Sequence, residues 1–386
     1  MKDVTAERKK ILFMIDSLGG GGAERVLSHI LRDLNRDLFE IELFLVIREG
    51  VYLPFVPKDI PIHSIFQSID RFRFRPLLYL YRFYRRCMLE LFKFFPPLLA
   101  WISGIEHTYD IGISFCEGHN TPLLKGKAKY FKKKIAWIHV DLRTHKAMIR
   151  LKDLQKQAPE FDRIYFVSEG AKEGFLELFP EQKGNPAMDI VFNPIDYQLI
   201  LQEAAKGPEI KSGKLTVIAI GRLTLQKRFD KLLNVHKRLL DKGIDHEVWI
   251  LGEGPDRKNL EIQARKLGIE KSCHFLGFQN PYPYLKAADI FAMTSDYEGL
   301  PVAVCEAMVL AKPIVSTAVT GPNELLENGK YGLLTGNNED AIEDDLQKML
   351  QQPELREAFS KKLIENRGNF IFPTDVVNIE LRLISL

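Results

Sequence analysis

Residues 290–306 read IFAMTSDYEGLPVAVCE: an apolar run, a polar turn and a second apolar run. The segment Ile290–Thr294 has the length and composition of a buried strand. Pro301–Leu310 follows as a predicted helix, in which proline fits the first turn because its missing N–H would have no partner there. A strand that leads through a short loop into a helix is the repeating unit of parallel α/β folds. This stretch therefore indicates the fold class.

The same alternation extends along the whole chain. Strands are predicted at Ile11–Leu18, Ile41–Ile47, Ile111–Phe115, Ile135–His139, Ile164–Val167, Leu215–Ile220, Val248–Leu251, His274–Leu276 and Ile314–Ser316. Helical segments between them include Lys227–Leu240 and Arg257–Leu267. Two such blocks predict an α/β protein with two Rossmann-like domains, whose loops face a central cleft. We expect an N-terminal domain at 1–195, a C-terminal domain at 196–370, and a helix in 371–386 that crosses back to the first domain.

Composition limits the class of protein. The chain has 386 residues, of which 46% are hydrophobic and 27% charged, as in folded soluble proteins. Its four cysteines show neither paired nor metal-ligand spacing, which indicates core thiols in a reducing compartment. The N-terminal sequence MKDVTAERKK has no apolar signal core, so we expect a cytoplasmic protein. Lys and Arg outnumber Asp and Glu by 30 to 24 in residues 1–195, and are outnumbered 24 to 27 afterwards.

Two carboxylates in the opening stretch are candidate ligand-binding groups. Glu298 lies ahead of the predicted helix, where it can reach hydroxyl groups of a sugar. Glu306 lies more than one turn inside an apolar helix, so its carboxylate needs a partner, and a ribose diol would supply two hydrogen bonds. The backbone N–H groups near Gly299 and Leu300 form a phosphate cradle at the helix N-terminus. The alternative is a surface carboxylate and a structural ion pair.

Two further segments of the C-terminal half follow predicted strands. Gly221-Arg222-Leu223-Thr224-Leu225-Gln226-Lys227 carries two cations that can neutralise a diphosphate, Arg222 as a bidentate donor and Lys227 as a point charge. A solvated basic loop is an equally open interpretation. Glycine-containing turns also follow strands around Glu253 and Phe278, and the main chain near Phe278 can hold a base. Each turn is by itself a weak indication.

As an ordered set, these motifs resemble the GT-B retaining glycosyltransferases of family 4. The resemblance covers residues 215–320 and includes the E-x7-E pattern Glu298…Glu306 with Gly221, Arg222 and Lys227. It implies that Arg222 and Lys227 bind the donor diphosphate, that Glu298 binds the sugar and that Glu306 binds the ribose. It also implies that the main chain after Gly299 contacts the phosphate or the sugar of the donor. No metal is expected, because the two cations take its place and no DxD-type site is evident.

The N-terminal half supplies candidates for the acceptor side. The loop Gly19-Gly20-Gly21-Gly22-Ala23-Glu24-Arg25 matches a G-G-A-E-R loop of the family, which implies contact of Gly21 and Gly22 with the donor; it is also a tight strand-to-helix turn. His139 ends a predicted strand, and the resemblance places it beside the reacting sugar. His119 and Asn120 follow the preceding strand, and Asp141 orients His139 or serves the acceptor. A structural histidine remains the alternative.

Residues 71–102 read RFRFRPLLYLYRFYRRCMLELFKFFPPLLAWI and predict a helix between Pro76 and Pro96. Cations from Arg71 to Lys93 recur at spacings of four and seven residues, which places them on one helical stripe. The candidate membrane contacts on this stripe are Arg75, Arg82, Arg86 and Lys93. No apolar run approaches the ~18 residues of a membrane span. We expect an in-plane amphipathic helix on an anionic bilayer. An ordinary domain helix is the alternative, and a lysine cluster at 125–134 supports the membrane or engages an acceptor diphosphate.

Together these features predict a retaining, metal-independent hexosyltransferase. We expect it to use a nucleotide diphosphate sugar, by default a UDP-sugar, and a lipid-linked or other membrane-associated glycan of bacterial surface polysaccharide assembly. Its expected location is the cytoplasmic face of the membrane, as a peripheral protein. Two alternatives remain: a nucleotide-sugar 2-epimerase of the same fold, or a non-catalytic membrane-bound partner of a glycan assembly complex. Nucleic acid is not an expected partner, because no recognised reading motif is present.

Overall fold

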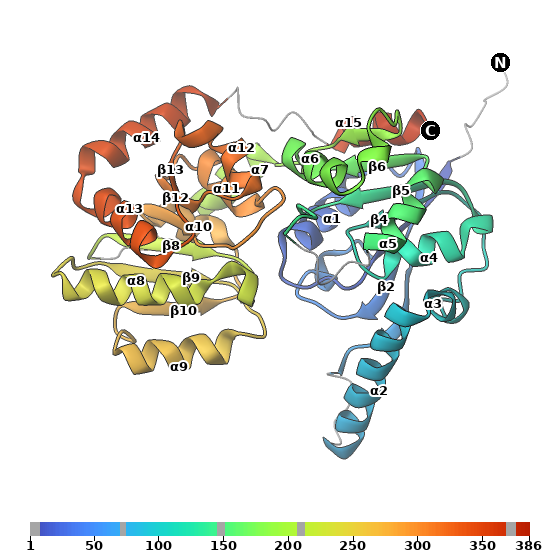
Figure 1. Ribbon diagram of the computed structural model, residues 1–386, viewed down its shortest axis with the longest axis horizontal. Helices are drawn as coiled ribbons and strands as arrows, with labels where there is room; N and C mark the ends of the chain where they lie inside the picture. The colour runs from blue at the N-terminus through green and yellow to red at the C-terminus, as the bar shows by residue number, and fades with distance from the viewer. Residues whose placement is uncertain (1–7, 70–74, 145–150, 207–212, 368–375) are drawn as a thin grey trace. The chain divides into compact units, whose positions relative to one another are not determined.

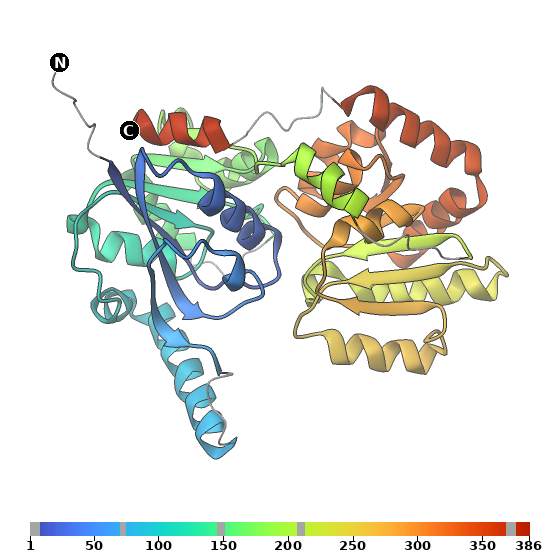
Figure 2. The same cartoon turned by 180° about the vertical axis from the view of Figure 1, so that it is seen from behind.

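The computed structural model describes residues 8–69, 75–144, 151–206, 213–367 and 376–386. The chain divides into two compact units, which Figure 1 and Figure 2 show from opposite sides. The first unit comprises Met1–Gly19, Ala23–Val191 and Val376–Leu386, and the second comprises Gly20–Gly22 and Phe192–Asp375.

The first unit is built on one parallel sheet, with seven strands among the described residues in the order β3-β2-β1-β4-β5-β6-β7. The strands are β1 (Lys9–Ile15), β2 (Phe39–Arg48), β3 (Ile62–Gln67), β4 (Tyr109–Phe115), β5 (Phe131–Ile138), β6 (Arg163–Phe166) and β7 (Met188–Ile190). The central strand β1 pairs Ile11 with Ile41 of β2 and with Ile111 of β4. All three isoleucines are buried, as expected of a sheet covered on both faces.

Helices connect these strands. They are α1 (Gly22–Asp33), α2 (Arg75–Phe94), α3 (Pro96–Ile102), α4 (Asn120–Gly126), α5 (Leu151–Gln157) and α6 (Glu169–Leu178), with 3₁₀ turns at Leu53–Phe55, Ala128–Tyr130 (η3), Ala158–Glu160 (η4) and Pro180–Gln182. The C-terminal helix α15 (Val376–Ile384) also packs in this unit, where Ile379 and Leu383 are buried. Lys9 donates to the carbonyl of Ile384 at 2.7 Å, which ties α15 to the first strand.

The second unit has its own parallel sheet, whose described strands follow the order β10-β9-β8-β11-β12-β13. The strands are β8 (Thr216–Ile220), β9 (Glu247–Leu251), β10 (Cys273–Gly277), β11 (Ile290–Met293), β12 (Ile314–Thr317) and β13 (Leu333–Thr335). The helices are α7 (Tyr197–Lys206), α8 (Phe229–Asp241), α9 (Arg257–Leu267), α10 (Pro281–Ala287), α11 (Val302–Val309), α12 (Thr320–Leu325), α13 (Glu339–Gln351) and α14 (Pro353–Glu365), with 3₁₀ turns at Leu225–Lys227 (η6) and Glu327–Gly329.

The predicted parallel α/β architecture is confirmed in both units, and each predicted strand overlaps an observed one. Three short strands, β3, β7 and β13, were not predicted because they are partly exposed and lack a long apolar run. One helix begins two residues later than predicted. The helix expected from Lys227 begins at Phe229, because Arg228 has a φ of 49° and interrupts the helical backbone; Lys227 therefore lies in the turn η6.

Strand order fixes where each unit can bind a ligand. In the first unit the chain passes from β1 to β2 on one side and later returns to β4 on the other, and the second unit repeats this with β8, β9 and β11. The loops after the two strands at such a reversal point away from each other and leave a crevice at the carboxyl ends of the strands. The relevant loops follow β1 and β4 in the first unit, and β8 and β11 in the second.

Helix α2 projects beyond the sheet of the first unit, as both views show. Its body-facing side is held by buried Phe92 and by Arg85, which pairs with Glu49 at 2.7 Å. An exposed apolar stripe repeats at spacings of three and four residues, and consists of Leu77, Leu80, Tyr84, Cys87, Leu91 and Phe94. Within the described ranges, no helix is long and apolar enough to cross a membrane.

The predicted cationic stripe is only partly visible. Arg82 and Arg86 are exposed on α2. Arg75 and Lys93 belong to the same helix, but their side chains lie outside the described part, and Arg71 is outside the described residues altogether.

Candidate functional site

Hydrogen bonds join the two loops at the strand reversal of the second unit. Thr294, directly after β11, donates its hydroxyl to the carbonyl of Lys227 at 3.0 Å. Gln226 donates its side-chain amide to the carbonyl of Tyr297 at 2.7 Å, and the Asp296 N–H donates to the carbonyl of Gln226 at 2.9 Å. The loop after β8 is thereby fixed against the loop after β11.

This framework brings Lys227 and Glu298 together, with 2.5 Å between Nζ and Oε1. The Glu298 residue is only 7% exposed. A carboxylate at this depth requires a positive partner, because its desolvation would otherwise be strongly unfavourable. The family resemblance implies that Lys227 and Glu298 contact different parts of a ligand. The structure shows them as one ion pair, which is the alternative that the sequence left open for Glu298.

A second cluster of charged residues holds the same two loops together. Arg228 and Lys231 both bind the Asp296 carboxylate, at 3.1 and 3.0 Å. Partial burial favours the neutral acid, but the hydrogen bonds from Lys231 and Arg228 outweigh it and hold the pKa of Asp296 below its usual value. Asp296 therefore helps to fix the chain between β11 and Glu298.

Arg222 has an exposed side chain in the loop after β8. The neighbouring glycine turn permits close packing behind it: Gly252 has a φ of +140°, and a Cβ there would lie 1.9 Å from the Gly221 carbonyl oxygen. Only glycine fits this approach. Glu253 of this turn receives Arg257 at 2.5 Å, and Phe278 follows β10 with about a third of its surface exposed.

Glu306 lies inside α11 and is 2% exposed. Tyr282, on α10, donates its hydroxyl to Glu306 Oε1 at 3.2 Å, a partner that the sequence analysis did not consider. Helix α11 begins at Val302, one residue later than predicted, with Pro301 as its N-cap. Gly299 and Leu300 are buried just before that helix, and a Cβ on Gly321 would lie 2.2 Å from the Gly299 carbonyl oxygen.

The corresponding loops of the first unit hold a different cluster. Asp16, the first residue after β1, lies 2.9 Å from Nδ1 of His119, and Asn120 donates to it at 2.8 Å. His119 and Asn120 stand at the start of α4, after β4. Gly21 and Gly22 lie where the loop after Asp16 becomes α1. Strand order thus brings together the predicted His119 and Asn120 with Asp16, which was not predicted.

His139 lies directly after β5 and is 8% exposed. Its ring packs 4.6 Å from that of Phe115, and burial lowers the pKa of His139 to about 3, so the imidazole is neutral near pH 7. Its Nε2 is buried and has no hydrogen-bond partner among the described residues. Glu117 accepts hydrogen bonds from the backbone N–H groups of His139 and Val140, and burial raises the pKa of Glu117 to about 7.

Asp141 is buried, and its carboxylate receives Arg143 Nη2 at 2.6 Å. The guanidinium of Arg143 compensates much of the negative charge of the buried Asp141 carboxylate. Asp141 follows His139 by two residues, so both lie at the carboxyl end of β5, as predicted from the sequence.

Sequence reasoning missed Asp16, Glu117, Tyr282 and Asp296. Asp16, Glu117 and Asp296 share one signal: each is a carboxylate within three residues of the end of a strand that flanks a reversal. That signal becomes readable only when the strand order is known. Tyr282 carries no such signal, because α10 reaches α11 through packing rather than through the chain. No group of three or more His, Cys, Asp or Glu suited to a metal occurs among the described residues.

Two parallel Rossmann-like sheets with loop crevices of this kind define a protein of the GT-B fold. Residues 202–365 match the family model described as glycosyl transferases group 1. The matched segment lies within the second unit, which therefore carries the sequence of a group 1 glycosyltransferase. The family predicted from the sequence is thereby confirmed, and the chain is a glycosyltransferase that uses nucleotide sugars.

Similarity to known proteins extends over nearly the full chain. The sequence is 26% identical, over 92% of this chain and 93% of the relative, to the N-acetylgalactosamine-N,N'-diacetylbacillosaminyl-diphospho-undecaprenol 4-alpha-N-acetylgalactosaminyltransferase of Campylobacter jejuni. Anabaena HepE, solved with UDP and glucose, has a TM-score of 0.69 at 18% identity, covering 98% of this chain and 99% of its own. WaaG, involved in lipopolysaccharide biosynthesis, has a TM-score of 0.62 at 14% identity, covering 94% and 96%.

Proposed function

We propose that this glycosyltransferase moves a hexosyl group, with retention of configuration, from a UDP-sugar to a lipid-linked or other membrane-associated glycan. The observation that carries the proposal is the Lys227–Glu298 pair at the strand reversal, with Glu306 buried on the helix that follows. A half-buried cation paired with a buried carboxylate, and a second buried carboxylate on the next helix, suit a ligand that carries both a diphosphate and hydroxyl groups.

The donor's parts are assigned to separate groups. Arg222 and Lys227 bind the diphosphate, and the main chain at Gly299 and Leu300 binds phosphate or sugar. Glu298 accepts hydrogen bonds from the sugar, and Glu306 accepts them from the ribose. The main chain of the turns at Glu253 and Phe278 holds the base.

In the reaction, the bond between the sugar's anomeric carbon and the diphosphate oxygen breaks, while the acceptor oxygen bonds to that carbon on the same face. The acceptor's proton passes to the departing phosphate. Arg222 and Lys227 stabilise the negative charge that grows on this phosphate, which is electrostatic catalysis. His139, neutral at pH 7, donates or accepts a hydrogen bond at the sugar, while His119, Asn120 and Asp141 serve the acceptor side. Gly21 and Gly22 allow the backbone to approach the donor.

Relatives support the choice of donor and acceptor class. HepE was solved with UDP and glucose, and the Campylobacter jejuni relative acts on a diphospho-undecaprenol-linked glycan. A further relative, AmsD of Erwinia amylovora, is named as a glycosyltransferase of amylovoran biosynthesis. These functions favour an acceptor of surface polysaccharide assembly. We place the enzyme at the cytoplasmic face of the membrane, held by Arg82 and Arg86 of α2 together with Arg75 and Lys93.

The test is a panel of radiolabelled nucleotide sugars incubated with the purified protein and membrane extracts, followed by extraction of lipid product. We expect transfer from one UDP-sugar, unchanged turnover in EDTA, and a loss of about a hundredfold in Arg222→Ala or Lys227→Met. Lys237→Met is the matched control, because Lys237 forms an exposed ion pair with Asp241 on α8.

Two outcomes would overturn the proposal. Full turnover in the Arg222→Ala/Lys227→Ala double variant would remove the assigned electrostatic role. Conversion of the nucleotide sugar to an epimer without any acceptor would show an isomerase instead. Titration of UDP by calorimetry separates the two kinds of failure, because it measures donor binding without an acceptor.

A further inference from the structure

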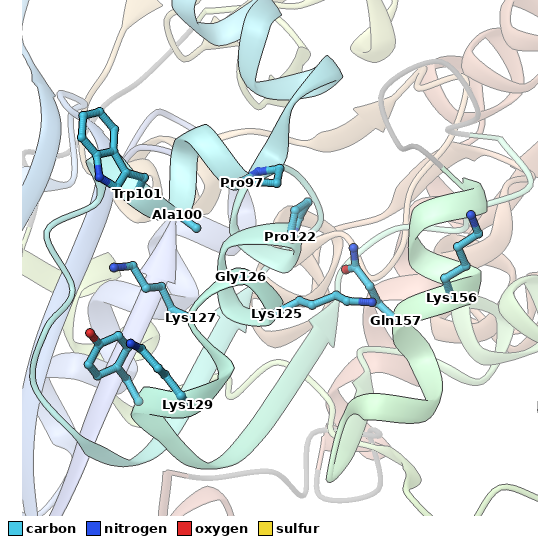
Figure 3. A pocket seen from close by; sticks show the side chains of 11 residues that line it. Pro97, Ala100, Trp101, Pro122, Lys125, Gly126, Lys127, Lys129, Lys156 and Gln157 are labelled. Carbon is cyan, nitrogen blue, oxygen red and sulfur yellow. The ribbon is translucent and has the colours of Figure 1, made fainter.

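A basic cavity of about 630 Å³ opens in the first unit, away from the candidate site. Figure 3 shows its wall: Trp101, Lys127 and Lys129 on one side, and Lys125, Lys156 and Gln157 on the other. Its lining includes these four lysines and no acidic residue. The cavity therefore presents positive charge to whatever enters it.

Chain direction places this cavity at the opposite edge of the sheet from the candidate site. Trp101 lies near the end of α3, before β4; Lys127 and Lys129 lie between α4 and β5; Lys156 lies at the end of α5, before β6. In a parallel sheet the segments that enter strands gather at the amino edge, whereas His119 and His139 follow strands at the carboxyl edge. The cavity is thus a separate site.

The lysines differ in how far their charge is already compensated. Lys125 pairs with Glu160 at 2.7 Å. Lys127 and Lys129 instead lie over the ring of Tyr130, 5.2 and 4.9 Å from its centre. An aromatic face attracts a cation without neutralising it, so both ammonium groups keep full charge for an anion.

A second polar feature of the wall is independent of the lysines. Gln157 is 6% exposed, and its Oε1 is buried without a hydrogen-bond partner among the described residues. A buried amide oxygen of this kind is unfavourable unless a donor reaches it. A ligand that carries both a phosphate and hydroxyl groups would satisfy the lysines and Gln157 together.

The surroundings identify the source of such a ligand. Trp101 is 78% exposed at the rim, and Phe94 and Phe95, where α2 meets α3, are 76% and 56% exposed. Exposed aromatic side chains beside cations are typical of surfaces that lie at the headgroup level of a bilayer. The apolar stripe of α2 continues from this rim.

We propose that the cavity binds the phosphate-bearing headgroup of an anionic glycerophospholipid in the bilayer surface. Lys127 and Lys129 bind its phosphate, a glycerol hydroxyl donates to Gln157, and Trp101 enters the interface. The proposal deepens, and rests on, the membrane association proposed above, but it does not involve the donor site.

Tryptophan emission provides the experiment. Of the three tryptophans, Trp137 and Trp249 are buried, so a change in emission on binding reports Trp101. We expect a blue shift with phosphatidylcholine vesicles that contain phosphatidylglycerol, no shift with phosphatidylcholine alone, and none with inorganic phosphate or glycerol phosphate. Trp101→Phe should abolish the shift while flotation with the vesicles persists.

Matched lysine variants test the cavity itself. Lys127→Gln/Lys129→Gln should weaken partitioning onto phosphatidylglycerol vesicles by about fivefold per lysine, and the arginine pair should restore it. The control Lys132→Gln/Lys133→Gln removes equal charge from lysines that are paired with Asp110 and Asp162 outside the cavity, and should weaken partitioning much less. Gln157→Leu should reduce the preference for phosphatidylglycerol over phosphatidic acid, which lacks the headgroup hydroxyls.

Equal losses in the two lysine pairs would overturn the cavity assignment and leave only a diffuse charge effect. Binding of inorganic phosphate with the same lysine dependence would overturn the lipid assignment. UDP titration of the same variants should remain unchanged, so a failure here is distinguishable from a failure of the proposed transferase function.

Discussion

Lys227, from the loop after β8, donates to Glu298, from the loop after β11, with 2.5 Å between Nζ and Oε1. The two residues lie far apart in the sequence, and the strand reversal of the second sheet brings them together. Because the two charges compensate each other, a substitution of either residue should change both the free energy of unfolding and the charge of the binding loops.

Lys227→Met should lower the free energy of unfolding by about 3 kcal/mol, because it leaves Glu298 buried without its cation. Lys227→Met/Glu298→Leu should recover much of this loss, since no buried charge remains, yet it should stay inactive. Denaturant unfolding measures both, and Lys237→Met should change stability by less than about 1 kcal/mol. Equal stability of the two variants that lack Lys227 would contradict a buried ion pair.

Tyr282→Phe removes the hydroxyl that donates to Glu306. A lost hydrogen bond to a charged group corresponds to about 1.5–3 kcal/mol, so we expect UDP to bind at least tenfold more weakly if this contact orients Glu306 for the ribose. Calorimetric titration measures the affinity. Tyr284→Phe, on the same helix, removes an exposed hydrogen bond to Gln279 and should leave UDP affinity unchanged.

His236 and His246 form a buried pair in the second unit, with 2.9 Å between ring nitrogens. Burial, then the charge of His246, lowers the pKa of His236 to about 3, and burial also lowers that of His246. Only the unfolded chain takes up these protons below about pH 6.5. Stability is therefore complete above that pH. For His236 it falls between pH 6.5 and 3, by up to about 1.4 kcal/mol per pH unit, and the lowered pKa of His246 adds to the fall below pH 6.5.

Urea unfolding at a series of pH values measures this dependence. His236→Gln should make it shallower, whereas the exposed His274→Gln should not. A pH dependence that is unaltered by loss of His236 would contradict the buried neutral pair.

Gly252→Ala should destabilise the second unit by several kcal/mol and abolish UDP binding, because its Cβ would overlap the Gly221 carbonyl and displace the Arg222 loop. Gly243→Ala supplies the control, with a φ of +78° but open space around the new Cβ. The control should lose only the ~1–2 kcal/mol of left-handed backbone strain. Thermal unfolding with and without UDP distinguishes the two variants.

The sequence allowed the fold to be predicted because buried parallel strands are continuous apolar runs, such as Phe291 and its neighbours in β11. It also allowed Glu298, Glu306, Arg222 and Lys227 to be placed near strand ends. Their pairing could not be predicted, since β8 and β11 are adjacent only through strand order. The same limit applied to Asp16, which meets His119 from a loop about a hundred residues away.

Partial exposure concealed other features. Strand β13 has only one buried residue, so its pattern resembled a loop. Arg228 gave no sign that it would adopt a left-handed backbone and end the turn that holds Lys227. The lysine cavity was visible as a charge cluster in the sequence, but its aromatic wall is assembled from α3 and η3, which are separate in the chain.

The position of helix α15 affects how domains of this protein can be exchanged with those of a relative. Because Val376–Leu386 belongs to the first unit, the long segment Phe192–Asp375 of the second unit is inserted within it, and the backbone enters and leaves that segment once each. Arg382 of α15 pairs with Asp189 of β7, just before that segment begins. A chimaera that exchanges donor specificity therefore needs two junctions, near Val191 and Val376, and a single splice would leave the acceptor unit with a foreign terminal helix.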